Sequence, residues 1–152
     1  MTQQKITPFI WFKDQAEPAM RFYVSIFKNS KMGEVSRHGK KIFSAGFTIE
    51  GQELIAFNGG PHFKITPAIS FFVDCKTQKE VDRLWNKLSK GGKKMRCGWL
   101  TDKFGVSWQI IPTVLGELMG DKNPAKAGRV MEAMMKMQKI DIEGLKKAYR
   151  GR

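Results

Sequence analysis

Two amide side chains, Asn58 and Gln109, stand at similar places in the sequence and could orient a ligand. Each lies three residues before a proline, in the segments 58–61 and 109–112. A side-chain amide both donates and accepts hydrogen bonds, so two of them in a binding site would fix the orientation of a polar ligand. Hydrogen bonding to the neighbouring backbone is the alternative interpretation.

Cys97 and His62 are the candidates for covalent or acid–base chemistry. The thiol could act as a nucleophile, but no base lies near it in sequence, and buried cysteines are usually inert. His62 follows the segment 59–61 and could act as a general base, because an imidazole titrates near neutrality. A structural thiol and a histidine in a surface loop are the simpler interpretations, so we assign no catalytic residue.

Length and composition favour one domain, residues 1–152. With 41% hydrophobic residues, the chain is large enough to bury one core. No apolar stretch is long enough to span a bilayer, and the N-terminus shows no apolar signal region. Cys75 and Cys97 are too few for a disulfide framework and form no Cys-x-x-Cys pair. We therefore expect a cytoplasmic protein with reduced thiols and no membrane association.

The charge of the chain is strongly basic, with 27 Lys and Arg against 14 Asp and Glu and a net charge of +13. Such an excess attracts anionic partners. The basic residues fall in the groups 40–41, 90–96 and 122–152, and they form no continuous run. This distribution favours a solvated basic surface over nucleic-acid binding.

An internal repeat organises the sequence. The segment Lys5-Ile6-Thr7-Pro8-Phe9-Ile10 recurs as Lys64-Ile65-Thr66-Pro67-Ala68-Ile69. Each copy opens an alternating apolar run, which predicts strands over 6–12 and 65–73. Apolar residues at helical spacing then predict helices over 16–27 and 78–90. Thr77 should cap the second helix, and the glycines at 91 and 92 should end it.

Side-chain alternation predicts which strand residues face the helices. The residues expected on the helix-covered face are Pro8, Ile10, Phe12, Ile55, Phe57, Ile69, Phe71, Val73, Val106 and Trp108. The opposite, open face should carry Thr7, Phe9, Trp11, Ala56, Asn58, Thr66, Ala68, Ser70, Phe72, Ser107 and Gln109. From this second set we predict a ligand-binding site formed by Phe9, Trp11, Asn58, Ser70, Ser107 and Gln109.

The C-terminal region predicts two helices. Asn123 followed by Pro124 is a strong helix start, and Asp141 should begin a second helix that ends near Tyr149. The first helix is crowded with apolar residues: Val130, Met131, Met134, Met135 and Met137. Methionines at helical spacing usually fill gaps in a core, although they also line promiscuous grooves. We expect these helices to close over the sheet or over a second subunit.

Two βαβββ units in tandem, each with a turn like 102–105 before its last strand, resemble the vicinal oxygen chelate (glyoxalase, bleomycin resistance and dioxygenase) superfamily. The segments that resemble its PhnB-like branch are 6–14, 19–27, 58–63, 97–100, 102–112 and 123–149. The resemblance implies an α+β fold with a cupped mixed sheet. Its parts would be repeat 1 over about 4–61, repeat 2 over about 64–112, and C-terminal helices over about 114–150.

The resemblance also implies a divalent metal on the concave face, held by His and Glu from the first and last strand of each unit. The first-strand positions here are Thr7, Pro8 or Phe9 and Thr66, Pro67 or Ala68, and the last-strand positions are Asn58 and Gln109. None offers a carboxylate or an imidazole, the groups such a cation needs. His38 and His62 lie in predicted turns. We therefore expect no metal.

Some PhnB-like proteins carry the label 3-demethylubiquinone-9 3-methyltransferase, which would require an S-adenosylmethionine site. No predicted strand is followed by the glycine-rich turn and helix that such a cofactor usually occupies. We reject that activity and expect no cofactor. The favoured function is metal-independent binding of a small organic ligand by a homodimer. The alternatives are an enzyme with non-standard acid–base or thiol chemistry and a weak polyanion-binding protein.

Overall fold

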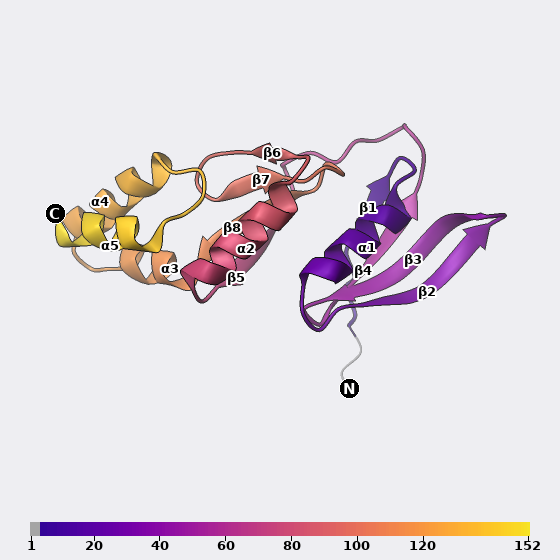
Figure 1. Cartoon of the computed structure of the whole chain (residues 1–152), viewed down its shortest axis with the longest axis horizontal. Helices are drawn as coiled ribbons and strands as arrows, with labels where there is room; N and C mark the ends of the chain where they lie inside the picture. Colours follow the sequence, from indigo (N-terminus) through magenta and orange to yellow (C-terminus); the bar gives the residue numbers. More distant parts are fainter. Residues whose placement is uncertain (1–3) are drawn as a thin grey trace. The chain divides into compact units, whose positions relative to one another are not determined.

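A computed structural model describes residues 4–152 and divides the chain into two compact units (Figure 1). The first unit extends to Ile65, and the second runs from Thr66 to Arg152. Residues 1–3, part of the N-terminal stretch expected to contain no signal region, lie outside the described residues. Among the helices of residues 4–152, none has the length and apolarity needed to cross a bilayer.

The first unit is a four-stranded mixed sheet covered by one helix. Its elements are β1 (Phe9–Phe12), α1 (Ala16–Ile26), β2 (Lys31–His38), β3 (Lys41–Ile49) and β4 (Gln52–Asn58). The strand order is β1-β4-β3-β2, with β1 parallel to β4 and the other pairs antiparallel. The crossover through α1 makes β2 parallel to β1. Because β3 runs antiparallel to both β2 and β4, β4 is also parallel to β1.

The core of the first unit lies between α1 and the sheet. The helix residues buried there recur every three or four positions: Ala16, Ala19, Met20, Tyr23 and Ile26. The ring of Tyr23 stacks on Phe47 of β3 with 6.3 Å between centroids. Burying a side chain of this size contributes about 1.5 to 3 kcal/mol. This contact therefore fixes the face of the sheet that the helix covers.

The second unit repeats this arrangement. Its elements are β5 (Ser70–Cys75), α2 (Gln78–Ser89), β6 (Lys93–Lys94), β7 (Trp99–Thr101) and β8 (Ser107–Pro112), in the order β5-β8-β7-β6. The predicted α+β fold of two βαβββ units is therefore confirmed, as two four-stranded mixed sheets. The opening strands begin at Phe9 and Ser70, later than predicted; β5 is preceded by a turn in which the Ile69 N–H donates to the Thr66 carbonyl at 3.4 Å.

Polar side chains define the ends of the elements in the second unit. The hydroxyl of Thr77 accepts a hydrogen bond from the Glu80 N–H at 3.2 Å, which confirms the predicted cap of α2. The buried carboxylate of Asp102 builds the turn before β8. It accepts bonds from the Val106 N–H at 3.1 Å and from the Trp108 indole N–H at 2.9 Å. The turn and the largest core side chain of β8 are thus fixed together.

Three helices follow β8: α3 (Thr113–Met119), α4 (Pro124–Met135) and α5 (Ile142–Arg150). The predicted caps of α4 and α5 are confirmed, since the side chains of Asn123 and Asp141 accept hydrogen bonds from the first turns of these helices. The prediction of two helices missed α3. That helix starts directly after Pro112 and has no side-chain cap, so the sequence carries no start signal for it.

The C-terminal helices have a small core of their own. Its buried members are Ile111, Leu115, Val130, Ile140 and Leu145. Met134 and Met137 pack against this core, as gap-filling methionines should, whereas Met131 and Met135 are exposed. The interpretation of the methionines as core therefore holds for Met134 and Met137. Because Ile111 belongs to β8, the helices pack against the end of the second sheet.

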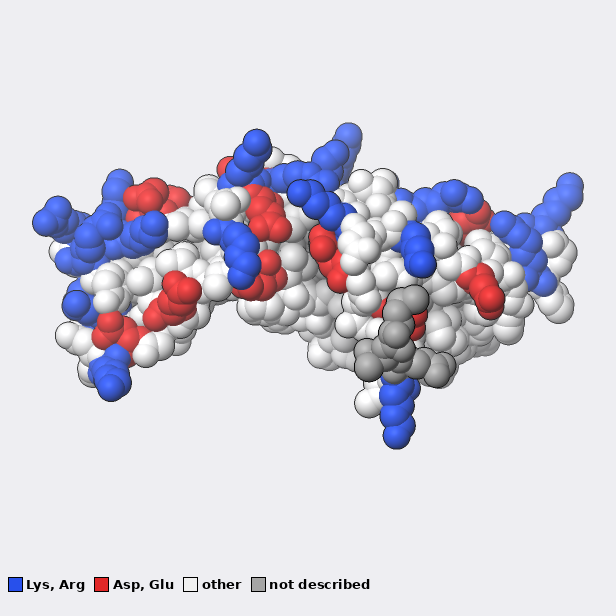
Figure 2. All heavy atoms as spheres, turned by 90° about the horizontal axis from the view of Figure 1, so that it is seen from below, with Lys and Arg blue, Asp and Glu red and all other residues white. Residues whose placement is uncertain are grey.

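The basic side chains are spread over the surface. On the face shown in Figure 2, Lys and Arg are separated by acidic and uncharged residues along most of its length. They gather most closely at the end that holds the C-terminal helices. Several of these cations have partners, as in the 2.9 Å ion pair between Lys139 and Asp82.

Candidate functional site

A cluster of aromatic rings occupies the open face of the first sheet. Phe57 lies at its centre, with ring centroids 5.4 Å from Phe9, 5.0 Å from Trp11 and 5.1 Å from Phe43. Phe63 extends the cluster through an edge-on contact with Trp11 at 5.0 Å. We call these five residues the aromatic face. Rings at these separations attract one another, so the cluster is ordered although it is partly exposed.

Strand register and two glycines position the aromatic face. Trp11 of β1 pairs with Phe57 of β4, which places the two rings side by side. The Trp11 indole N–H donates to the Gly60 carbonyl at 2.9 Å. A Cβ atom at Gly59 would collide with the rings of both Trp11 and Phe57. Only glycine fits there, because the chain passes directly over the two rings.

The predicted faces of β4 were wrong. Leu54 and Ala56 are buried on the helix-covered side, whereas Ile55 and Phe57 belong to the open side. Asn58 therefore lies on the helix-covered side. Its two bonds, described below, are the backbone bonding that we gave as the alternative to a ligand contact. A role of Asn58 in ligand binding stays a prediction, but it is not on the open face.

Both ends of the Asn58 amide are occupied. Its Oδ1 accepts a hydrogen bond from the Ala16 N–H at 2.9 Å, and its Nδ2 donates to the Ile42 carbonyl at 2.9 Å. The side chain thus ties β4 to the start of α1 and to β3. Asn58 and Gln109 do not occupy equivalent positions in the two units. Phe12 and Phe71 are matching residues of the two opening strands. Asn58 pairs with Phe12, whereas Trp108, and not Gln109, pairs with Phe71.

In the second unit the predicted faces of β8 are confirmed, whereas Ile69, predicted on the helix-covered face, precedes β5 and is exposed. Trp108 is buried, and Ser70, Ser107 and Gln109 lie on the other side of the sheet. The Gln109 amide donates to the Ser70 hydroxyl at 3.0 Å, and the hydroxyls of Thr101 and Ser107 are 3.2 Å apart. We call these four side chains the polar face. Three of the six predicted site residues thus come together here, and two, Phe9 and Trp11, lie on the aromatic face.

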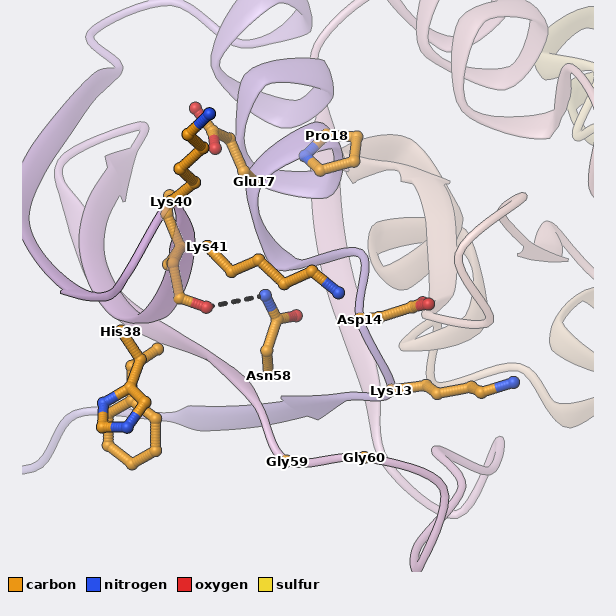
Figure 3. Close-up of a pocket in the computed structure, with 12 residues that line it drawn as sticks. Lys13, Asp14, Glu17, Pro18, His38, Lys40, Lys41, Asn58, Gly59 and Gly60 are labelled. Atoms are coloured by element: carbon orange, nitrogen blue, oxygen red, sulfur yellow. Dashed lines mark hydrogen bonds between the residues drawn. The ribbon is translucent and has the colours of Figure 1, made fainter.

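A pocket of about 650 Å³ lies in the first unit, where the start of α1, the turn between β2 and β3, and the end of β4 meet (Figure 3). Its lining is Lys13, Asp14, Glu17, Pro18, His38, Lys40, Lys41, Ile42, Phe43, Asn58, Gly59 and Gly60. His38 is the last residue of β2, so its predicted turn position was wrong. Sequence reasoning missed this pocket because it joins segments that are far apart in the chain.

The two cysteines are free and differ in environment. Cys75 is buried, and this burial, with the nearby Glu80 and Asp74, raises the pKa of its thiol to about 12. A thiol in that state is a poor nucleophile at neutral pH. Cys97 is partly exposed and has a left-handed backbone with φ 60°, and its N–H donates to the Met137 carbonyl at 2.9 Å. This bond ties the backbone of residue 97 to the segment after α4 and does not involve the thiol.

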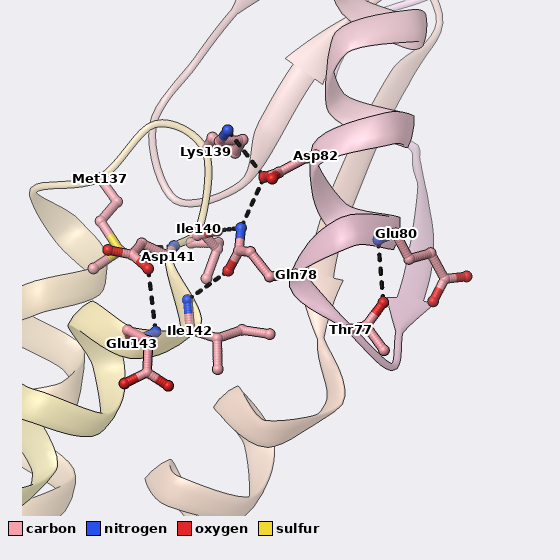
Figure 4. Close-up of polar contacts among 10 residues, drawn as sticks. All are labelled: Thr77, Gln78, Glu80, Asp82, Met137, Lys139, Ile140, Asp141, Ile142 and Glu143. Carbon is pink, nitrogen blue, oxygen red and sulfur yellow. Dashed lines mark hydrogen bonds and ion pairs between the residues drawn. The ribbon is translucent and has the colours of Figure 1, made fainter.

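The side chain of Gln78, on α2, forms hydrogen bonds with the segment after α4 (Figure 4). The Gln78 amide donates to the Ile140 carbonyl at 3.0 Å and to Asp82 at 2.9 Å, and it accepts from the Ile142 N–H at 2.8 Å. Lys139 pairs with the same Asp82 carboxylate at 2.9 Å. Hydrogen bonds from Gln78 and Lys139 lower the pKa of Asp82. The C-terminal helices are therefore an integral part of the second unit.

The donor atoms on the open faces do not suit a divalent cation. They are neutral amide and hydroxyl oxygens beside aromatic rings, whereas such cations are held by carboxylates and imidazoles. Within residues 4–152, no three His, Cys, Asp or Glu side chains converge where they could hold a metal ion. The metal that the fold resemblance implies therefore does not fit these residues.

Comparison with known proteins gives the family. A family model described as 3-demethylubiquinone-9 3-methyltransferase matches residues 4–111. The PhnB protein of Bacillus cereus is 36% identical, with 72% of this chain and 100% of that chain covered and a TM-score of 0.69. The chain belongs to this PhnB-like family. It shares the vicinal oxygen chelate fold, and its match to the family model ends before α3.

More distant structures share the fold alone. The PhnB-like chain is 21% identical to protein PA1353 of Pseudomonas aeruginosa, with coverage of 72% and 98% and a TM-score of 0.60. It is 16% identical to the fosfomycin resistance protein FosX of Listeria monocytogenes, solved with Mn(II) and sulfate, with coverage of 71% and 90% and a TM-score of 0.53. No curated protein matches the sequence.

The methyltransferase description belongs to the family model. In this PhnB-like protein the loops that lead into α1 and α2 are residues 13–15 and 76–77, and neither contains a glycine. A nucleotide cofactor at the start of such a helix needs a glycine-rich turn, because the backbone must approach the cofactor closely. These loops do not have that sequence.

Proposed function

We propose that this PhnB-like protein binds a small organic ligand on the open faces of its sheets, without a metal ion. The aromatic face carries this proposal. Phe9 and Phe63 are 57% and 66% exposed, yet each contacts an ordered ring of the cluster. A planar ligand stacked on such rings gains about 0.5 to 1.5 kcal/mol per ring pair beyond the area it buries. The ligand that fits this surface is planar and largely apolar.

The polar face supports the same function with hydrogen-bonding groups. The Gln109 amide uses one N–H for the Ser70 hydroxyl. Its side-chain oxygen accepts no hydrogen bond within the described part of the chain, so that oxygen is available to a ligand. Together with the hydroxyl of Ser70, it offers both donors and acceptors in a small area, whereas Ser107 is buried and bonds to Thr101. Groups of this kind set the orientation of a neutral ligand.

Native mass spectrometry of freshly purified protein, followed by identification of any released compound, tests ligand binding directly. Indole then serves as a planar probe in calorimetric titrations. We expect Phe9→Ala to weaken indole binding about tenfold, since a ring contact is lost. Met135→Ala, which removes a comparable exposed apolar side chain from α4, is the control. No saturable binding, or equal losses in the two variants, would contradict the proposal.

We also propose a homodimer that works in the cytoplasm. Ile69 and Phe72 of the second unit are 75% and 61% exposed, and a second copy of the chain would remove them from water. Light scattering at tens of micromolar tests this, and a monomeric mass would contradict it. Two free thiols support a reducing compartment. Localisation of a fluorescently tagged chain checks this second point.

A further inference from the structure

The pocket beside α1 is separate in character from the open faces, because its lining is mainly charged. Three lysines and two carboxylates line it. The Glu17 carboxylate is already engaged outside the pocket by Arg21 at 2.8 Å and by Arg37 at 3.9 Å. Lys13, Lys40 and Lys41 form no ion pair within residues 4–152. The balance of charge left to an occupant is therefore positive.

Backbone and side-chain groups add to this positive character. Helix α1 begins at the pocket, and the N-terminal end of a helix carries a partial positive charge. The Asn58 NH2 group has two hydrogens, of which the Ile42 carbonyl takes one. Figure 3 shows the Lys41 side chain extending past Asn58 toward the side of the pocket that holds Asp14. An ammonium group and an amide donor thus face the same space.

Size and apolar surface narrow the class of occupant. A volume of about 650 Å³ lies within the range of small-molecule sites and exceeds what one inorganic ion fills. Pro18, Ile42 and Phe43 supply apolar surface next to the charged groups. An occupant that satisfies both parts of the lining has an anionic group attached to an apolar body.

We propose that this pocket, where the start of α1 meets the end of β4, is a second ligand site, which binds a small organic oxyanion. Its negative group lies between Lys41 and the Asn58 amide, and its apolar part lies against Ile42 and Phe43. A carboxylate and a phosphate monoester both have this chemistry. The site differs from the aromatic face in its charged lining, and the two surfaces share Phe43.

The test uses phenyl phosphate and benzoate as probes, with benzyl alcohol as the neutral control, in nuclear magnetic resonance titrations of the labelled full chain. We expect saturable shifts of the Glu17 and Lys40 amides, which line this pocket and do not belong to the aromatic face, with a Kd of about 1 mM or tighter. Benzyl alcohol should produce none. Tighter binding of phenyl phosphate than of benzoate would assign the site to phosphate esters, and the reverse order would assign it to carboxylates.

Two matched variants separate a built site from general basicity. Lys41→Gln should lower the affinity for both anionic probes about tenfold, because a charge-assisted contact is lost. Lys90→Gln makes the same charge change in the second unit and should leave both affinities unchanged. Phe9→Ala should weaken indole alone, which distinguishes this site from the aromatic face. Equal losses in the two lysine variants, or no saturable shifts in the unmodified protein, would overturn the proposal.

Discussion

The side-chain oxygen of Asn58 accepts a hydrogen bond from the Ala16 N–H at 2.9 Å, so the last residue of β4 caps the helix that follows β1. The residue at the N-cap of α1, Gln15, provides no side-chain cap. A cap supplied from a distant strand makes the start of α1 depend on the pairing of β4 with β1.

Asn58→Ala should lower the free energy of unfolding by about 1 to 3 kcal/mol, since the Ala16 N–H and the Ile42 carbonyl both lose their partner. Urea denaturation followed by circular dichroism measures this. Asn86→Ala, on α2, is the control and should change stability by less than about 0.5 kcal/mol. A similar loss in both variants would show that the two bonds of Asn58 contribute nothing specific.

Gln109→Ala should make the binding free energy of the co-purified ligand less favourable by about 1 to 3 kcal/mol, because a polar group of the ligand loses its partner. Its effect on stability should be smaller than that of Asn58→Ala, because the Ser70 hydroxyl can turn to water after losing Gln109. Calorimetry of the variant gives the affinity, and urea denaturation gives the stability. Unchanged affinity would remove the polar face from the binding site.

Gly59→Ala should disturb the aromatic face and cost about 1 to 3 kcal/mol, because the new methyl group would overlap Trp11 and Phe57. Gly46→Ala is the matched control, since a Cβ there meets nothing within 4 Å. Near-ultraviolet circular dichroism should change only in the first variant. If both variants kept the spectrum and stability of the original chain, the close passage of residue 59 over the rings would be disproved.

The Cys75 thiol should make stability depend on alkaline pH. Its pKa rises from 9.0 to about 12 in the folded state, so the thiol stabilises the fold fully below pH 9. That contribution is lost as the pH rises from 9 toward 12. The free energy of unfolding should fall across this window less steeply in Cys75→Ala than in the original chain. Identical slopes would contradict the prediction. In the folded chain at neutral pH, Cys75 should also resist thiol reagents until urea unfolds the protein.

Duplex DNA should bind weakly and without sequence preference at physiological salt, because the basic residues fall in separate groups and form no continuous run in the sequence. Fluorescence anisotropy with two unrelated duplexes, repeated at several salt concentrations, checks this. Any affinity should fall steeply with salt. Tight binding that discriminates between the duplexes would instead support a nucleic-acid function.

The fold was predictable because its signals are repeated. The two copies of the opening segment, the cap at Thr77 and the helix start at Asn123 are local patterns, and local patterns set local structure. The faces of β4 were mispredicted because Asn58 was aligned with Gln109 by counting from a proline. In the structure, β4 ends at Asn58, whereas β8 continues to Pro112. A shift of one residue reverses every face of a strand.

The pocket and the aromatic face were harder to foresee because both depend on contacts between distant segments. Nothing in the sequence near His38 indicates that its strand end will meet the start of α1. Phe57 was the missed centre of the aromatic face, and one signal for it was present. Leu54 and Ala56 stand two residues apart and can share the helix-covered face of a strand. The same alternation then places Phe57 on the open face.

Every strand in residues 4–152 pairs within its own half of the chain, in the orders β1-β4-β3-β2 and β5-β8-β7-β6. The contact that closes each sheet joins its first strand to its last, so it has the largest sequence separation among the strand pairs of each half. Once β4 has emerged from the ribosome, every strand of the first sheet has emerged as well. The first half can therefore fold while the second half is still being synthesised.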